Sequence, residues 1–180
     1  MPSSTQKRGV LDDSCPNVHL HHAAGGSSQH PITASEFTEL VSKQLRQSPY
    51  LNCDALDRLG KMGSSGVLFK LELAPYSYTL VAKGAGPGLP TVLGHETRIY
   101  DRLDRLQGDA VPVHLGMVSL DWGHTVTGGI KVYHMMLLSW AGDRAISLEV
   151  PNLAAETERC LKAARAGGVN HWDERNDNLL

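Results

Sequence analysis

Polar and ionisable side chains crowd a short stretch near the end of the chain, which reads His171-Trp172-Asp173-Glu174-Arg175-Asn176-Asp177-Asn178. In this stretch a carboxylate, Asp173, is followed five residues later by an amide, Asn178. Such a pair suits phosphoryl transfer, because the carboxylate can accept the proton of an attacking hydroxyl while the amide oxygen binds magnesium. A charged surface turn would use the same residue types, so both interpretations stay open on this stretch alone.

A lysine and a glutamate further upstream form a second candidate pair. Lys83 ends an expected strand, and Glu96 shares one stripe of the following helix with Ile99, Tyr100 and Leu103. A carboxylate on an otherwise apolar face is costly unless a partner neutralises it, so we expect an ion pair with Lys83. The pair would hold the lysine ready for phosphate groups. An exposed glutamate at the edge of the helix is the alternative.

Two glycine-rich segments could approach phosphates through their backbone N–H groups. The first, Gly63-Ser64-Ser65-Gly66, lies at the hairpin before the strand that starts near Val67. The second, Gly84-Ala85-Gly86-Pro87-Gly88, follows a strand and precedes a helix. A dinucleotide fingerprint would need a third glycine at position 89, which is Leu89, and the strands before it look antiparallel. The second segment is therefore expected to be a linker.

Residues 1–31 are rich in Ser, Gly, His and Pro without helix or strand periodicity, which predicts a disordered tail. Its histidines His19, His21 and His22 could bind a metal, but solvated side chains are the commoner outcome in such a tail. The three cysteines of the chain lie far apart, without metal-type spacing. We interpret them as reduced thiols of a cytoplasmic protein.

Residues 32–54 are expected to form an amphipathic helix and a linker. Thr33 and Glu36 fit a capping box, and helical spacing of apolar residues then continues over about 34–46 until Pro49. Strands are predicted near 55–61, 67–73, 76–83, 113–120 and 130–138, with helices near 92–106 and 153–166. Antiparallel strands with one inserted helix and a later helical region indicate the α+β class.

Composition excludes several classes of partner. The formal net charge is -2, with no block of like charges that would favour nucleic acid or an anionic membrane. No apolar run reaches the roughly 18 residues that a membrane span needs, and the N-terminus lacks the apolar stretch of a secretory signal. We therefore expect neither nucleic acid nor a membrane as partner.

Taken in chain order, these features resemble the protein-kinase superfamily, and in particular kinase-like proteins of filamentous fungi. The resemblance covers residues 55–180, which would be a partial kinase-like domain: an N-lobe of antiparallel sheet plus one helix, and the start of a helical C-lobe. It rests on the glycine hairpin, the strand lysine, the helix glutamate, Met135-Met136-Leu137-Leu138-Ser139-Trp140 and the H-x-D-x-x-x-x-N spacing.

The resemblance implies ATP and Mg²⁺ as cofactors and a role for each site residue. Gly63, Ser64, Ser65 and Gly66 would cover the phosphates, Lys83 would contact them and Glu96 would anchor Lys83. Backbone groups near Leu137 to Trp140, among them Leu138 and Trp140, would hold the adenine at the hinge between lobes. Asp173 would be the catalytic aspartate, Arg175 a phosphate contact and Asn178 a magnesium ligand.

The sequence departs from that family beyond its last motif. It ends two residues after Asn178, without an Asp-Phe-Gly-like metal ligand downstream. The resemblance therefore implies an ATP-binding phosphotransferase domain that is truncated after the catalytic loop and inactive as given. The alternative is a non-catalytic, pseudokinase-like protein-interaction module. In either case the incomplete C-lobe would expose the apolar side of helix 153–166, marked by Leu153, Cys160, Leu161 and Ala164. Such a surface invites either aggregation or a protein partner that covers it.

Overall fold

The computed structural model describes residues 30–56, 62–63, 66–76, 78–86, 90–140 and 152–170. Residues 1–29 of the expected tail lie outside this part, and so do His19, His21 and His22. The same holds for the site residues Ser64, Ser65, Asp173, Arg175 and Asn178.

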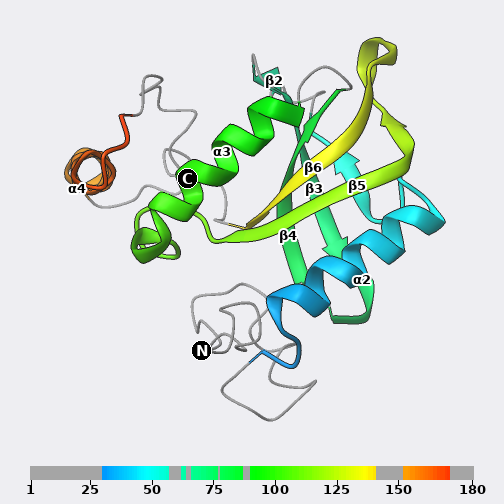
Figure 1. The fold of residues 1–180 in the computed structure, drawn as a ribbon, viewed down its shortest axis with the longest axis horizontal. Helices are drawn as coiled ribbons and strands as arrows, with labels where there is room; N and C mark the ends of the chain where they lie inside the picture. Colours follow the sequence, from blue (N-terminus) through cyan, green and yellow to red (C-terminus); the bar gives the residue numbers. More distant parts are fainter. Residues whose placement is uncertain are drawn as a thin grey trace.

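One antiparallel sheet organises the described residues (Figure 1). Its main strands lie in the order β1-β3-β4-β6-β5, and β2 pairs with β3 beside this path. Each of these strand pairs is antiparallel. The strands are β1 (Cys53–Ala55), β2 (Met62–Gly63), β3 (Gly66–Leu73), β4 (Tyr78–Ala85), β5 (His114–Thr125) and β6 (Lys131–Ser139). The α+β class predicted from the sequence is confirmed.

The predicted helix after Thr33 is also confirmed, as α2 (Ala34–Gln47). Thr33 forms the expected capping box: its Oγ1 accepts from the Glu36 N–H, and its own N–H donates to the Glu36 carboxylate. Phe37, Val41 and Leu45 are buried along one side of the helix. Figure 1 shows α2 lying along β5, and this side packs on the sheet.

The two faces of the sheet carry separate apolar clusters, because side chains alternate along each strand. On one face Leu80 and Ala82 of β4 join the α2 residues in the larger core. On the other face Val81 packs with Met136, Leu138 and the helix α3 (Pro90–Arg102). Since Lys83 alternates with Ala82, strand geometry places it on the α3 side.

Several element bounds differ from the prediction. Of the strand expected near 55–61, the structure shows β1 at Cys53–Ala55, and residues 57–61 lie outside the described part. The strand expected over 76–83 is observed as Tyr78–Ala85. The helix expected over 92–106 ends at Arg102, and residues Asp104–Leu106 form a separate 3₁₀ turn. The strand expected to end near 120 continues to Thr125, so the connection to β6 shrinks to a turn over Thr127–Gly129. Gly123 lies within β5 and not in the turn: a Cβ there would lie 2.9 Å from Tyr133 Cζ, so this glycine serves ring packing within the sheet. Gly128 and Gly129, with φ of 83° and 76°, make the real turn.

The last described element is α4 (Leu153–Ala166), which Figure 1 shows apart from the sheet beyond the end of α3. Arg159 of α4 forms an ion pair with Asp109, and Ala164 is buried. A Cβ on Gly167 would lie 2.7 Å from Leu103 Cδ2, so the end of α4 packs closely on the end of α3. Leu153, Cys160 and Leu161 are half-buried, so the apolar side of α4 is less exposed than the sequence predicted.

Among the described residues, no helix is both long and apolar enough to cross a membrane.

Candidate functional site

Lys83 and Glu96 form an ion pair that joins the sheet to α3. The Lys83 ammonium nitrogen lies 2.5 Å from Glu96 Oε1, and the side chains are 21% and 22% exposed. Lys83 leaves β4 on the α3 side, and Glu96 lies one turn before Tyr100 on the helix face that meets the sheet. The contact expected between these residues is present. Its part in holding a phosphate group stays a prediction.

Two glycines next to Lys83 stand where a larger residue would clash with neighbouring atoms. A Cβ on Gly66 would lie 2.5 Å from the Gly84 carbonyl oxygen and 3.7 Å from Lys83 Cγ. A Cβ on Gly84 would lie 2.6 Å from both Phe69 Cε2 and Val132 Cγ1. A larger residue at position 66 would push β3 away from β4 beside Lys83, and one at position 84 would clash with Phe69 and Val132 on the opposite face of the sheet. Gly63 pairs with Gly66 in the β2–β3 hairpin, so the predicted glycine hairpin lies at this end of the sheet.

Leu138 and Trp140 extend from β6 on the same face as Lys83. Leu138 is opposite Val81 in the sheet and is buried in the α3-side cluster. The Lys70 ammonium lies 5.2 Å from the ring centre of Trp140, within range of a cation–π contact. The structure therefore brings Gly66, Lys83, Glu96, Leu138 and Trp140 to one side of the sheet. Whether Asp173, Arg175 and Asn178 belong with them stays a prediction, since they lie outside the described residues.

A second polar junction, missed by the sequence prediction, fixes the far end of α3. The Gln107 side chain accepts a hydrogen bond from the His114 N–H at 2.8 Å and donates one to the Tyr100 carbonyl at 2.9 Å. It thus joins the last turn of α3 to the first residue of β5. The sequence contained one hint of this junction. Tyr100 follows Glu96 by one helical turn, so it also faces the sheet.

Burial perturbs both aromatic rings at this junction. The ring of His114 stacks on Tyr100, with 5.8 Å between their centres. Burial lowers the pKa of His114 from its ordinary value, and the negative charge of Asp101 acts in the opposite direction. Burial, with a contribution from Glu96, raises the pKa of Tyr100 to about 12. His114 Nε2 is buried without a hydrogen-bond partner in the described part of the chain. These shifts favour the neutral forms of both rings.

The described residues contain no cluster of metal ligands. Within them, no group of three or more His, Cys, Asp or Glu side chains is placed to hold a metal ion. The expected ATP and Mg²⁺ stay predictions from the sequence, as does the expected protein partner next to α4.

Comparison with known proteins finds a relative that is not named as a kinase. Over 175 residues, 97% of this chain, it is 48% identical to the meiotic driver SPOK2 of Podospora anserina. The chain spans 22% of the length of SPOK2. No protein-family model matches the chain.

This comparison corrects the kinase-like assignment. The named relative is a meiotic driver, and neither comparison supplies support for a kinase, an ATP-binding phosphotransferase or a pseudokinase-like module. The physical reason for the wrong assignment is that the sequence features on which it rested also have structural uses. In this fold Lys83 and Glu96 pair with each other, and Gly66 allows β3 to approach β4 closely. Each signal therefore has a structural use that does not depend on an activity, so their order does not identify one. The expected fungal origin is compatible with the source of SPOK2.

Proposed function

We propose that the chain acts as part of a meiotic driver, the activity for which SPOK2 is named. The observation that carries the proposal is the 48% identity to SPOK2, which extends over 97% of this chain. Identity over nearly the whole chain supports a shared fold for the matching segment of SPOK2. Since the chain covers 22% of SPOK2, its contribution would be that of one module within the driver.

We place this module in the cytoplasm. Cys53 is a buried free thiol, and Cys160 is also free. Burial raises the pKa of Cys53 to about 12, with a smaller effect from Asp54, so its thiol stays protonated and unreactive. Free cysteines of this kind are typical of reducing compartments.

A segment exchange in SPOK2 tests the proposal. The matching segment of SPOK2 is replaced by this chain, and strains carrying the chimera are crossed with strains that lack it. The expected result is that progeny inherit the chimeric gene in excess of the Mendelian share, as they do with SPOK2. SPOK2 from which the segment is deleted should show no excess.

Matched variants control for folding of the exchanged segment. Leu80 is fully buried in the core, so Leu80→Asp should abolish the excess by unfolding the module. Lys43 is exposed on α2, so Lys43→Ala should leave the excess unchanged. A chimera that accumulates to the level of SPOK2 but is inherited in Mendelian proportion would contradict the proposal. So would a deletion that leaves transmission unchanged.

A further inference from the structure

The last helix, α4, rests on the connection between α3 and β5. We call residues 103–113 the α3–β5 connection. Arg159 of α4 forms its ion pair with Asp109 of this connection at 3.0 Å, and its guanidinium also donates to the Asp109 carbonyl at 3.5 Å. A Cβ on Gly167, at the end of α4, would lie 2.7 Å from Cδ2 of Leu103, the first residue of the connection. Figure 1 shows α4 away from the strands, so its position follows that of the connection.

Gln107 fixes the α3–β5 connection to both of its neighbours. Its side chain bonds the Tyr100 carbonyl of α3 and the His114 N–H of β5. A backbone hydrogen bond keeps the connection compact, since the Ala110 N–H donates to the Leu106 carbonyl at 2.9 Å. Loosening of the Tyr100–Gln107–His114 junction would therefore free the base on which α4 rests.

The ring of His114 is the group of this junction that can take up a proton in mild acid. It is half-buried, stacks on Tyr100 and has the apolar Leu138 opposite it on β6. Its Nε2 is buried and has no hydrogen-bond partner among the described residues. Asp101 of α3 supplies a negative charge that acts on the ring. Tyr100 is neutral, because burial raises the pKa of its hydroxyl to about 12.

A proton on this ring costs free energy in the closed structure. The imidazolium carries an N–H at both nitrogens, so Nε2 would become a buried donor without an acceptor. The charge would also be partly removed from water. This cost outweighs the attraction of Asp101, since the pKa of His114 is lowered overall. Opening of the junction would expose both nitrogens to water and remove these costs.

We propose that protonation of His114 opens the Tyr100–Gln107–His114 junction and releases the α3–β5 connection together with α4, as an acid-sensitive latch. The proton binds the open form more tightly than the closed form, so opening increases as the pH falls below the ordinary histidine pKa of 6.5. The sheet and α2 share their own apolar core, so this opening does not require them to unfold.

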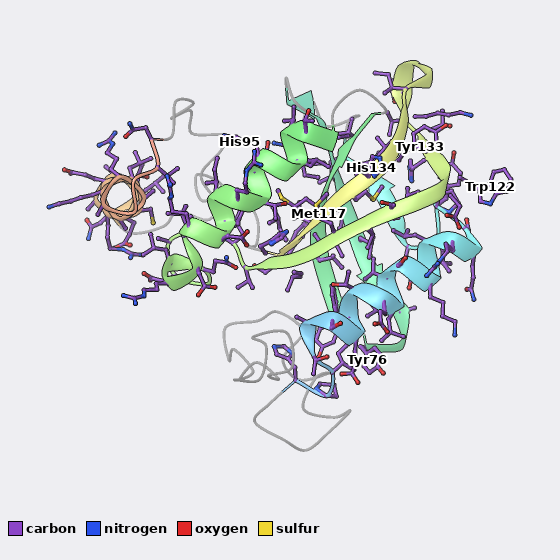
Figure 2. All side chains as sticks on the ribbon, in the orientation of Figure 1. Tyr76, His95, Met117, Trp122, Tyr133 and His134 are labelled. Carbon is purple, nitrogen blue, oxygen red and sulfur yellow. The ribbon has the colours of Figure 1, made fainter. Side chains whose placement is uncertain are left out.

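Hydrogen exchange of the 180-residue chain at about pH 7.5 and about pH 5.5 tests the latch. After correction for the intrinsic exchange rate, the equilibrium constant for opening of residues 103–113 and α4 should exceed that of β3 and β4 at both pH values. It should rise about threefold to tenfold at the lower pH. His114→Gln should remove this rise, because glutamine does not titrate. His95→Gln, at an exposed position of α3 (Figure 2), is the matched control, since it exchanges the same residue types outside the junction.

Two further variants separate the latch from other causes of opening. Gln107→Ala breaks the junction without a titration, so it should raise the opening of the connection and α4 already at the higher pH. Asp109→Asn removes the ion pair with Arg159 and should leave the rise in acid intact. A rise in acid that His114→Gln retains would overturn the proposal, as would equal opening of the wild type at the two pH values. Opening of α4 and the connection only together with β3 and β4 would overturn it as well.

Discussion

At the scale of single residues, the half-buried imidazole of His114 is one of two groups whose protonation the fold opposes, the other being His30. Burial lowers the pKa of His114 from the ordinary value of 6.5, and Asp101 offsets this only in part. At a pH between the folded-state and the unfolded-state pKa of His114, the unfolded chain binds more protons than the folded chain does. The contribution of His114 to stability is therefore complete above pH 6.5 and is lost as the pH falls toward the folded-state pKa.

This linkage predicts a smaller acid sensitivity when His114 is replaced. Lowering the pH from about 7.5 to about 5.5 should reduce the free energy of unfolding, and this fall should be smaller in His114→Gln. Urea titrations at the two pH values measure it. His95→Gln, at an exposed position of α3, is the control for exchanging a histidine for a glutamine. Part of the fall should remain in His114→Gln, because burial also lowers the pKa of His30. An equal fall in wild type and His114→Gln would exclude this role.

Single residues also show how far a sequence can predict a site. The contact of Lys83 with Glu96 was predictable, because a carboxylate on an apolar helix stripe needs a nearby cation. Gln44 was not, although it is buried: its side chain donates to the carbonyls of Leu51 and Glu72 and accepts from the Ala74 N–H. These partners come from segments whose meeting depends on the finished fold. Periodicity marks a polar residue on a buried face, but it does not name the backbone groups that the residue will satisfy.

At the scale of elements, α3 is attached to the sheet at two separate points. The Lys83–Glu96 pair fixes its middle, and Gln107 fixes its end to β5. In the part of the chain that the structure describes, α3 packs on the sheet through a small apolar cluster that includes Leu93, Met136 and Leu138. The ion pair should therefore contribute measurably to the attachment of this helix.

A double-mutant cycle tests that contribution. Lys83→Met, Glu96→Gln and the double variant should give a coupling free energy of about 1 kcal/mol, since both side chains are mostly shielded from water. Native-state hydrogen exchange should show faster opening of α3 than of β3 and β4 in each single variant. The exposed Arg159–Glu156 pair of α4 is the control, and its coupling should be much smaller. Equal coupling in the two pairs would mean that the Lys83–Glu96 contact does not hold α3.

Element types followed from the sequence more reliably than element ends did. The β3–β4 pair, α2 and α4 all lie where periodicity and capping residues placed them. The end of β5 did not, because Gly123 reads as a turn residue in the sequence while it serves packing against Tyr133 in the fold. A glycine chosen for close approach and a glycine chosen for a positive φ look identical until the neighbouring strand is known.

At the scale of the whole molecule, α2 belongs to the same core as the sheet. Phe37, Val41 and Leu45 share one apolar cluster with Leu71 and Leu80 of the central strands. The sequence predicted residues 32–54 as a helix and linker preceding a domain that starts at residue 55. That division stays a prediction, but the shared core implies that α2 and the sheet unfold together.

A buried and an exposed position on α2 test this cooperativity. Val41 is fully buried against the sheet, so Val41→Ala should lower the free energy of unfolding by about 2 kcal/mol. Glu39 is exposed on the same helix, so Glu39→Ala should change it by less than about 0.5 kcal/mol. If α2 and the sheet form one cooperative unit, Val41→Ala will reduce hydrogen-exchange protection equally in α2, β3 and β4. Loss of protection confined to α2 would show that the helix opens on its own. The sheet would then be the folding unit, and α2 a cover that can leave the face carrying Leu71, Leu80 and Ala82.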